Sequence, residues 1–148
     1  MEFLGGRSYG SGAGAPGVGN ILVVDDEGTI RTLLKDVLVR EGHEVTVISG
    51  GRQAIDLMER RRFDLVVTDL KMPGTDGVEV LLAAKEVDPK LPVLVITGYP
   101  SVESMARLVR MGASDYITKP FNIDLIKVTV AKLLNRKRYG STYWPCLN

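Results

Sequence analysis

Three aspartates follow two predicted strands at the points where the apolar residues stop. The apolar run 21–24 ends in Asp25 and Asp26, and the run 65–67 is followed by Asp69 two residues later. Because the carboxyl ends of parallel strands meet at one edge of a sheet, we expect these carboxylates to share one pocket if the two strands are neighbours. Like charges held so close are unfavourable unless a cation joins them.

The residue types at this edge suit phosphoryl transfer. Carboxylate oxygens favour a hard cation such as Mg²⁺, which binds few carboxylates and keeps several waters. An aspartate beside such a cation can act as a nucleophile and form an aspartyl-phosphate. Thr97 closes the fourth predicted strand and Lys119 follows the fifth. A lysine and a hydroxyl at these places could contact the oxygens of a phosphoryl group bound to Asp69.

Each of these residues also has a plain structural interpretation. Asp25 and Asp26 could cap the helix that follows them. Thr97 could be an ordinary strand-end residue, and Lys119 a solvated loop lysine. Tyr116 could be a core aromatic of the fifth strand. Two adjacent acids that face a third across the sheet are harder to explain as caps, whereas Thr97, Lys119 and Tyr116 favour a functional site only in combination.

Strand-like and helix-like patterns alternate along the chain and would position these residues. Five strand–helix units in a row predict an α/β fold, a doubly wound parallel sheet with helices on both faces. We expect strands at 20–26, 44–48, 63–67, 92–96 and 115–117, and helices at about 30–41, 51–61, 76–87, 102–111 and 122–138.

Apolar spacing predicts which helix faces turn inward. In the fourth helix we place the core stripe on Val102, Met105, Ala106 and Val109. Leu108 and Met111 then lie beside that stripe, as Leu125 and Val128 do on the fifth helix. Such extra apolar positions form either a docking surface or peripheral core, and the sequence leaves both readings open.

Length and charge limit the class of protein. The chain has 148 residues, of which 45% are hydrophobic, and a net charge of +1. We expect one domain at 20–138, preceded by a flexible glycine-rich leader at 1–19, of the kind an expression vector adds, and followed by an irregular tail at 139–148. Near-neutral charge and the lack of a long apolar stretch predict a cytoplasmic protein without direct nucleic-acid or membrane contact.

The leader contains a glycine pattern that could be mistaken for a dinucleotide-binding motif. Gly12, Gly14 and Gly17 match G-x-G-x-x-G. That motif needs a strand before its glycines and a helix starting on them. No strand precedes these glycines, so the pattern predicts no nucleotide site.

Four segments, ILVVDDE, VVTDLKMPGTDG, VLVITG and DYITKPF, together resemble the receiver domain of bacterial response regulators in two-component signalling. The resemblance runs from about residue 20 to 138 and implies a flavodoxin-like (βα)5 fold with strand order 2-1-3-4-5. Residues 96–121 are similar to receivers of enhancer-binding transcriptional activators. The resemblance implies a signalling domain that takes a phosphoryl group from a histidine kinase or phosphotransfer protein, and not an enzyme that acts on other substrates.

The resemblance also assigns the phosphoacceptor and the metal ligands. Asp69 would accept the phosphoryl group. Asp26 and Asp69 would bind Mg²⁺ together with the backbone carbonyl of Lys71, and Asp25 would reach the ion directly or through water. Lys119 would contact the phosphoryl group.

Further roles concern switching and phosphoryl lifetime. Thr97 is similar to a switch hydroxyl, and Tyr116 to the aromatic that rotates inward with it. Pro120 matches a position where the family usually has a cis peptide bond. Lys71 and Tyr99 occupy positions that tune loss of the phosphoryl group. Both are bulky and neither is an acid or amide, so we expect a longer-lived phosphorylated state than in fast chemotaxis receivers.

The expected output surface is the face formed by the fourth helix, fifth strand and fifth helix, which would dock an effector domain or a second copy of the chain. The chain would be the regulatory domain of a transcriptional response regulator. The alternatives are a stand-alone receiver and a degenerate one that only binds partners. A hydrolase of the haloacid-dehalogenase type would need an acid two residues beyond Asp69, where the chain has Lys71.

Overall fold

The computed structural model describes residues 18–72, 74 and 76–139, and the side chains up to residue 137. Most of the expected leader, with Gly12, Gly14 and Gly17, and most of the expected tail therefore lie outside the described residues. In the described part no helix is long and apolar enough to cross a membrane. The elements are β2 (Asn20–Val24), α1 (Gly28–Arg40), β3 (Glu44–Ile48), α2 (Gly51–Arg60), β4 (Leu65–Asp69), α3 (Gly77–Val87), β5 (Val93–Thr97), α4 (Val102–Arg110), β6 (Asp115–Thr118) and α5 (Ile123–Tyr139).

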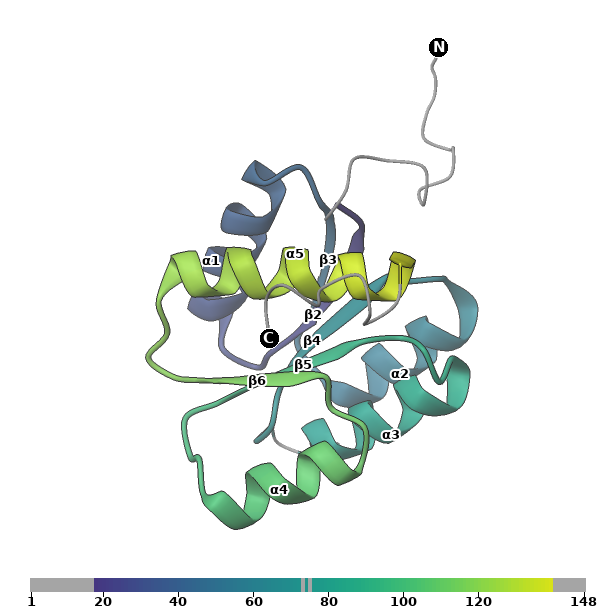
Figure 1. The fold of residues 1–148 in the computed structure, drawn as a ribbon, viewed down its shortest axis with the longest axis vertical. Helices are drawn as coiled ribbons and strands as arrows, with labels where there is room; N and C mark the ends of the chain where they lie inside the picture. The colour runs from purple at the N-terminus through teal and green to yellow at the C-terminus, as the bar shows by residue number, and fades with distance from the viewer. Residues whose placement is uncertain (1–17, 73, 75, 140–148) are drawn as a thin grey trace.

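The five described strands form one parallel sheet in the order β3-β2-β4-β5-β6, which confirms the expected order 2-1-3-4-5. Helices α1 and α5 cover one face and α2, α3 and α4 cover the other (Figure 1). The register pairs Val24 with Thr68 and Asp69 with Ile96. The ends of β2, β4 and β5 therefore lie side by side, on the left in Figure 1.

Two apolar cores form because successive strand residues point to opposite faces of the sheet. In β2, Ile21 and Val23 join the core beneath α1 and α5, whereas Leu22 and Val24 join the core beneath α2, α3 and α4. Every residue of β4 and β5 is buried. Their apolar runs are continuous for this reason, as expected of strands covered on both faces.

Two glycines end helices by adopting a backbone conformation that other residues rarely adopt. Gly42 has φ 96° and Gly112 has φ 107°, and they follow the last residues of α1 and α4. Left-handed glycines at this position are common because they lack a Cβ. Both predicted helix ends are confirmed.

The predicted inner face of α4 is wrong. Leu108 is the one buried residue of this helix, and both Leu108 and Met111 pack against the core on that face. Val102 is 89% exposed and Val109 is 56% exposed, although both were placed in the core stripe. Both stripes have helical spacing, so the pattern alone could not choose between them.

Candidate functional site

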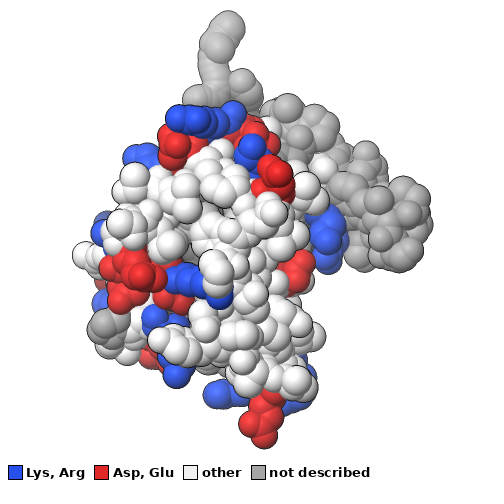
Figure 2. All heavy atoms as spheres, turned by 90° about the vertical axis from the view of Figure 1, so that its left-hand side faces the viewer, with Lys and Arg blue, Asp and Glu red and all other residues white. Residues whose placement is uncertain are grey.

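Acidic side chains gather at the carboxyl edge of the sheet. Asp25 follows β2 and is 2% exposed, Asp69 ends β4 and is 7% exposed, and Glu27 is exposed beside them. One carboxylate oxygen from each lies within 4.8 Å of the other two, so the three could hold a metal ion. Figure 2 views this side and shows a compact acidic group with basic side chains next to it. An all-oxygen set of this kind suits a hard cation.

Lys119 reaches into the acidic group from the loop after β6. Its ammonium donates to Asp25 Oδ2 at 3.1 Å, to Glu27 Oε1 at 3.0 Å and to Asp69 Oδ2 at 3.3 Å. A lysine ammonium has three N–H donors, so these three bonds use all of them. Lys119 therefore supplies the positive charge of the site, and its alternative interpretation as a solvated loop lysine is wrong.

The charges in this cluster affect one another. Burial, and then the neighbouring charge of Asp25, raises the pKa of Asp69, and the contacts of Asp69 with Lys119 and with the backbone N–H of Lys71 only partly offset this. Burial disfavours the charged form of Lys119, but Glu27, Asp25 and Asp69 outweigh it and raise the pKa of Lys119. The lysine stays positive, while the negative charge of Asp69 is costly. A bound cation would relieve that cost.

The structure separates the two neighbouring aspartates. Asp25 is buried, and its Oδ1 accepts a hydrogen bond of 2.9 Å from the backbone N–H of Glu27. Asp26 is exposed and lies outside the group of three carboxylates. The alternative that these aspartates cap α1 is wrong, because Glu27 occupies the N-cap position and makes no side-chain cap bond.

Sequence reasoning missed Glu27. Its signal was the third acid in the run Asp25-Asp26-Glu27, directly after an apolar strand. A glutamate at the start of a helix is ordinarily a solvated residue with a favourable position in the helix dipole. The contact of its side chain with Lys119, and its closeness to the carboxylates of Asp25 and Asp69, show that it belongs to the site.

Thr97 connects the end of β5 to the loop that carries the lysine. It is 1% exposed, and its carbonyl oxygen accepts a bond of 2.8 Å from the backbone N–H of Lys119. Its Oγ1 accepts from the backbone N–H of Tyr99 at 3.0 Å. Tyr116, on the neighbouring strand, is 37% exposed. The alternative reading of Tyr116 as a core aromatic is therefore wrong.

The two loops beside Asp69 and Thr97 touch through Lys71 and Tyr99. The ammonium of Lys71 lies 5.5 Å from the centre of the Tyr99 ring, within the range of a cation–π contact. The peptide bond between Lys119 and Pro120 is cis, as expected. Lys71, Tyr99 and Lys119 thus come from three different loops at the carboxyl edge of the sheet.

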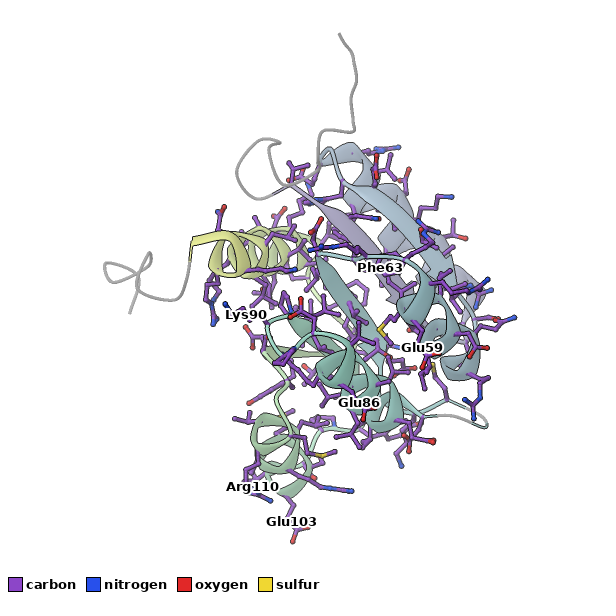
Figure 3. All side chains as sticks on the ribbon, turned by 90° about the vertical axis from the view of Figure 1, so that its right-hand side faces the viewer. Glu59, Phe63, Glu86, Lys90, Glu103 and Arg110 are labelled. Atoms are coloured by element: carbon purple, nitrogen blue, oxygen red, sulfur yellow. The ribbon has the colours of Figure 1, made fainter. Side chains whose placement is uncertain are left out.

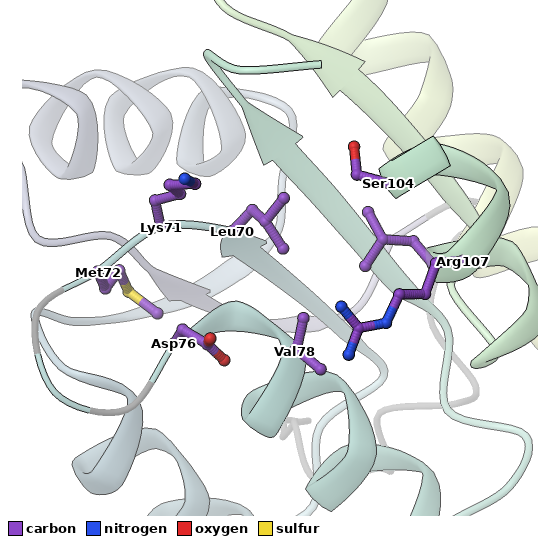
Figure 4. A pocket seen from close by; sticks show the side chains of 8 residues that line it. Leu70, Lys71, Met72, Asp76, Val78, Ser104 and Arg107 are labelled. Carbon is purple, nitrogen blue, oxygen red and sulfur yellow. The ribbon is translucent and has the colours of Figure 1, made fainter. Parts of the chain in front are cut away.

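A cavity of about 390 Å³ lies behind the loop that follows Asp69. Figure 4 shows Leu70 and Met72 from that loop, Val78 from α3 and Arg107 from α4 around it. It does not contain the carboxylates of Asp25 and Asp69 and is lined mainly by apolar atoms. The cavity therefore lies between α3 and α4, beside the acidic group and not within it.

The family model for the response regulator receiver domain matches residues 21–131. The chain is 38% identical over 117 residues to sporulation initiation phosphotransferase F of Bacillus subtilis, which covers 79% of this chain and 94% of that protein. It is 39% identical over 115 residues to the transcriptional regulatory protein ZraR of Escherichia coli O157:H7, which covers 78% of this chain and 26% of that protein. The chain therefore spans about a quarter of ZraR.

Solved structures show the same likeness. A CheY-like response regulator receiver domain protein from Methanospirillum hungatei matches with a TM-score of 0.78 and 30% identity, over 81% of this chain and 96% of that chain. NtrX from Brucella abortus matches with a TM-score of 0.76 and 34% identity, over 82% of this chain and 28% of that chain.

Proposed function

The chain belongs to the response regulator receiver domain family, and we propose that it accepts a phosphoryl group on Asp69. Receiver domains are signalling domains of two-component systems, which work with histidine kinases or phosphotransfer proteins, and transcriptional regulators are among the relatives of this chain. The observation that carries the proposal is the ammonium of Lys119 bonded to both buried aspartates. This contact places the carboxylate of Asp69 beside a positive charge, to which a phosphoryl group on Asp69 could bind in turn.

Asp69 would act as the nucleophile. One of its carboxylate oxygens attacks the phosphorus of a phosphohistidine, and an oxygen–phosphorus bond forms as the phosphorus–nitrogen bond breaks. The electron pair of the broken bond leaves with the imidazole, which takes up a proton. The strand β4, buried at all five positions, holds the nucleophile in place. Lys119 donates hydrogen bonds to the phosphoryl oxygens.

The donor set fits Mg²⁺, because carboxylate oxygens converge at the site and the negative charge of Asp69 is poorly compensated. Asp25 and Asp69 would hold the ion, and the family resemblance adds Asp26 and the backbone carbonyl of Lys71. When bound, the ion offsets negative charge on the phosphoryl oxygens. Asp25 keeps its side chain fixed through the backbone N–H of Glu27.

Switching would pass through Thr97 and Tyr116 to the face formed by α4, β6 and α5. The Thr97 hydroxyl would move toward the phosphoryl group, and Tyr116 would rotate inward with it. Exposed apolar residues on this face support a docking role: Val102, Val109, Tyr116, Leu125 and Val128. A hollow of about 520 Å³ lies between α4 and Tyr116. We propose that an effector domain or a second copy of the chain docks here.

The chain is proposed to be the regulatory part of a transcriptional regulator. The relatives ZraR, FleR and AtoC, which match over about a quarter of their length, support this role. The match to nearly the whole of sporulation initiation phosphotransferase F supports a stand-alone receiver instead. Two observations on the natural gene would favour a transcriptional regulator over a stand-alone receiver. An effector domain would be encoded in the same reading frame, and deletion of the segment that encodes this chain would abolish regulated transcription.

The test of phosphorylation is intact-protein mass after incubation with acetyl phosphate and Mg²⁺. We expect the wild type to gain one phosphoryl group, and Asp69→Asn or a metal-free sample to gain none. No gain in a folded wild-type protein would favour the degenerate receiver, which only binds partners.

Two further measurements test lifetime and output. We expect Tyr99→Glu and Lys71→Asn to lose the phosphoryl group faster than the wild type, because both replace a bulky side chain with one that can position water. Equal or slower decay in both variants would contradict the proposed long lifetime. In NMR spectra, the amide resonances of α4 and β6 should shift on phosphorylation, while those of α2 should stay unchanged. Shifts confined to the loops around Asp69 would argue against the proposed face.

A further inference from the structure

The ammonium of Lys119 is fully engaged before any phosphoryl group arrives. Its three carboxylate contacts are 3.0 Å to Glu27, 3.1 Å to Asp25 and 3.3 Å to Asp69. Each contact uses one of its three N–H donors. A phosphoryl oxygen can therefore gain a hydrogen bond from Lys119 only if one carboxylate gives up its own.

The three carboxylates differ in what release would cost them. The side chains of Asp25 and Asp69 are 2% and 9% exposed, so each needs a charged partner when ionised. The side chain of Glu27 is 57% exposed, and water can solvate it after release. Before the oxygen–phosphorus bond forms, Glu27 is therefore the partner whose release costs least.

Local structure keeps Glu27 close to the lysine. Its backbone N–H donates to Asp25 Oδ1 at 2.9 Å, and its carbonyl oxygen accepts from Arg31 N in the first turn of α1. The backbone is thus anchored to the buried aspartate on one side and to the helix on the other. Only the side chain is free to swing between Lys119 and solvent.

We propose that Glu27 is a positioning residue that holds Lys119 in the unphosphorylated protein and competes with the phosphoryl group for its ammonium. The inference rests on the phosphorylation of Asp69 proposed above. Glu27 acts through Lys119 and does not touch the reacting phosphorus. Without Glu27, the Lys119 ammonium can donate a hydrogen bond to the phosphoryl group at a lower cost, and phosphorylation is faster.

The experiment compares Glu27→Gln, Glu27→Asp and the wild type. Glutamine keeps the length and loses the charge, whereas aspartate keeps the charge and loses the reach. Glu41→Gln is the matched control, because Glu41 is also a partly exposed glutamate paired with a lysine, at the other end of α1. The rate of phosphoryl gain from acetyl phosphate is followed by intact mass over a series of Mg²⁺ concentrations, with circular dichroism to show that each variant is folded.

We expect the maximal rate at saturating Mg²⁺ to rise about two- to fivefold in both Glu27 variants, the size that an exposed ion pair contributes. Glu41→Gln should match the wild type. Equal or lower maximal rates in both Glu27 variants would overturn the inference. Acceleration in Glu27→Gln alone would also overturn it, because repulsion by charge would then explain the effect without the contact.

Two other outcomes are separated by the same data. A change only in the Mg²⁺ concentration that gives the half-maximal rate would make Glu27 part of the metal site and overturn the positioning role. No phosphoryl gain in the wild type would overturn the proposed function together with this inference. Gain in the wild type without acceleration in the variants overturns the inference alone.

Discussion

Helices α3 and α4 have similar beginnings but very different attachments to the sheet. Each follows a central strand that ends in a site residue, Asp69 for β4 and Thr97 for β5. Each starts with a capping box, in which the N-cap side chain accepts a hydrogen bond from the backbone N–H of the third helical residue, whose own side chain accepts one from the N-cap backbone N–H. Yet α3 buries four residues, Gly77, Val80, Leu81 and Ala84, whereas α4 buries Leu108 alone.

The surroundings of the two helices differ in the same way. The first residue of α3, Gly77, lies against the end of β4, and its N–H donates to the carbonyl oxygen of Leu70 at 2.9 Å. In contrast, cavities of about 390 Å³ and 520 Å³ lie on the two sides of α4. Figure 3 shows α4 at the margin of the molecule with Glu103 and Arg110 directed away from it.

This difference indicates a division of roles. Asp69, the proposed phosphoacceptor, is followed by a helix that could not move without disturbing the core, and this would keep the carboxylate in place. Strand β5, which ends in the proposed switch residue Thr97, leads into a helix that buries one residue, and local opening of such an element costs little free energy. We therefore expect a small bias at the site to be enough to shift α4.

The largest expected effect compares two buried leucines. Leu81→Ala in α3 should lower the free energy of unfolding by about 3–5 kcal/mol, because it leaves a cavity in the packed core. Leu108→Ala in α4 should cost only about 1–2 kcal/mol, because detachment of α4 limits the loss. Urea unfolding measures both values. Equal costs would mean that α4 is as firmly held as α3.

The next effect concerns the close approach of α3 to the end of β4. A Cβ at Gly77 would overlap the carbonyl oxygen of Asp69 and come within 2.7 Å of Leu70 Cα. Gly77→Ala should therefore destabilise the protein by about 2–3 kcal/mol and slow phosphorylation, because α3 or the loop must shift.

Gly28→Ala provides the control for this glycine. Gly28 is the first residue of α1, and an added Cβ would meet nothing closer than the Arg31 guanidinium at 3.5 Å. Alanine at this position should be neutral or stabilise by less than about 1 kcal/mol. A stable, rapidly phosphorylated Gly77→Ala protein would show that α3 does not fix Asp69.

A smaller effect is expected from the helix caps. Asp76 accepts a bond of 3.1 Å from the backbone N–H of Glu79, and Ser101 accepts one of 3.0 Å from that of Ser104. Asp76→Ala should lower global stability by about 1 kcal/mol. Ser101→Ala should change it by less than about 0.5 kcal/mol, because α4 frays before the domain unfolds.

Amide hydrogen exchange separates the two caps further. Ser101→Ala should speed exchange within α4 while exchange in α3 stays unchanged. Loss of protection across the whole sheet in Ser101→Ala would contradict the independent opening of α4.

Much of the fold followed from the sequence because the strongest patterns report burial. The continuous apolar runs of β4 and β5 predicted buried strands, and the structure confirms both. The inner face of α4 was predicted wrongly, because the stripe with Val102 and the stripe with Leu108 are both periodic. The choice depends on the loop that leads from β5 into α4, which the spacing of apolar residues does not describe.

The candidate site shows the same limit. The acids at the strand ends could be identified from the sequence, because carboxylates that gather next to buried strands are unfavourable without a cation. The separation of buried Asp25 from exposed Asp26, and the arrival of Glu27 at Lys119, depend on how the chain bends between β2 and α1. Adjacent acids look alike in a sequence, and only the course of the backbone decides which of them meets the lysine.

The smallest expected effect is the cost of keeping Asp69 ionised on the rigid side of the molecule. Burial, followed by the charge of Asp25, raises the pKa of Asp69 above its usual 3.8, so the folded state binds a proton more tightly than the unfolded state. Ionised Asp69 therefore destabilises the fold at pH values above its folded pKa, and this penalty falls as the pH drops through that pKa toward 3.8.

Asp69→Asn should then be slightly more stable than the wild type at pH 7.5, by less than the cost of removing the Asp76 cap, and the advantage should shrink as the pH is lowered. Urea unfolding between pH 7.5 and 5 measures this, with the exposed Asp36→Asn as the control that gains no stability. Mg²⁺ should reverse the order, because it binds the folded wild type and stabilises it. A less stable Asp69→Asn protein at pH 7.5 without metal would mean that the contact with Lys119 outweighs burial. The unfavourable buried charge of Asp69 thus lies on the firmly packed side of the molecule, where a bound cation would offset it, and α4 is the loosely packed element that we expect to respond.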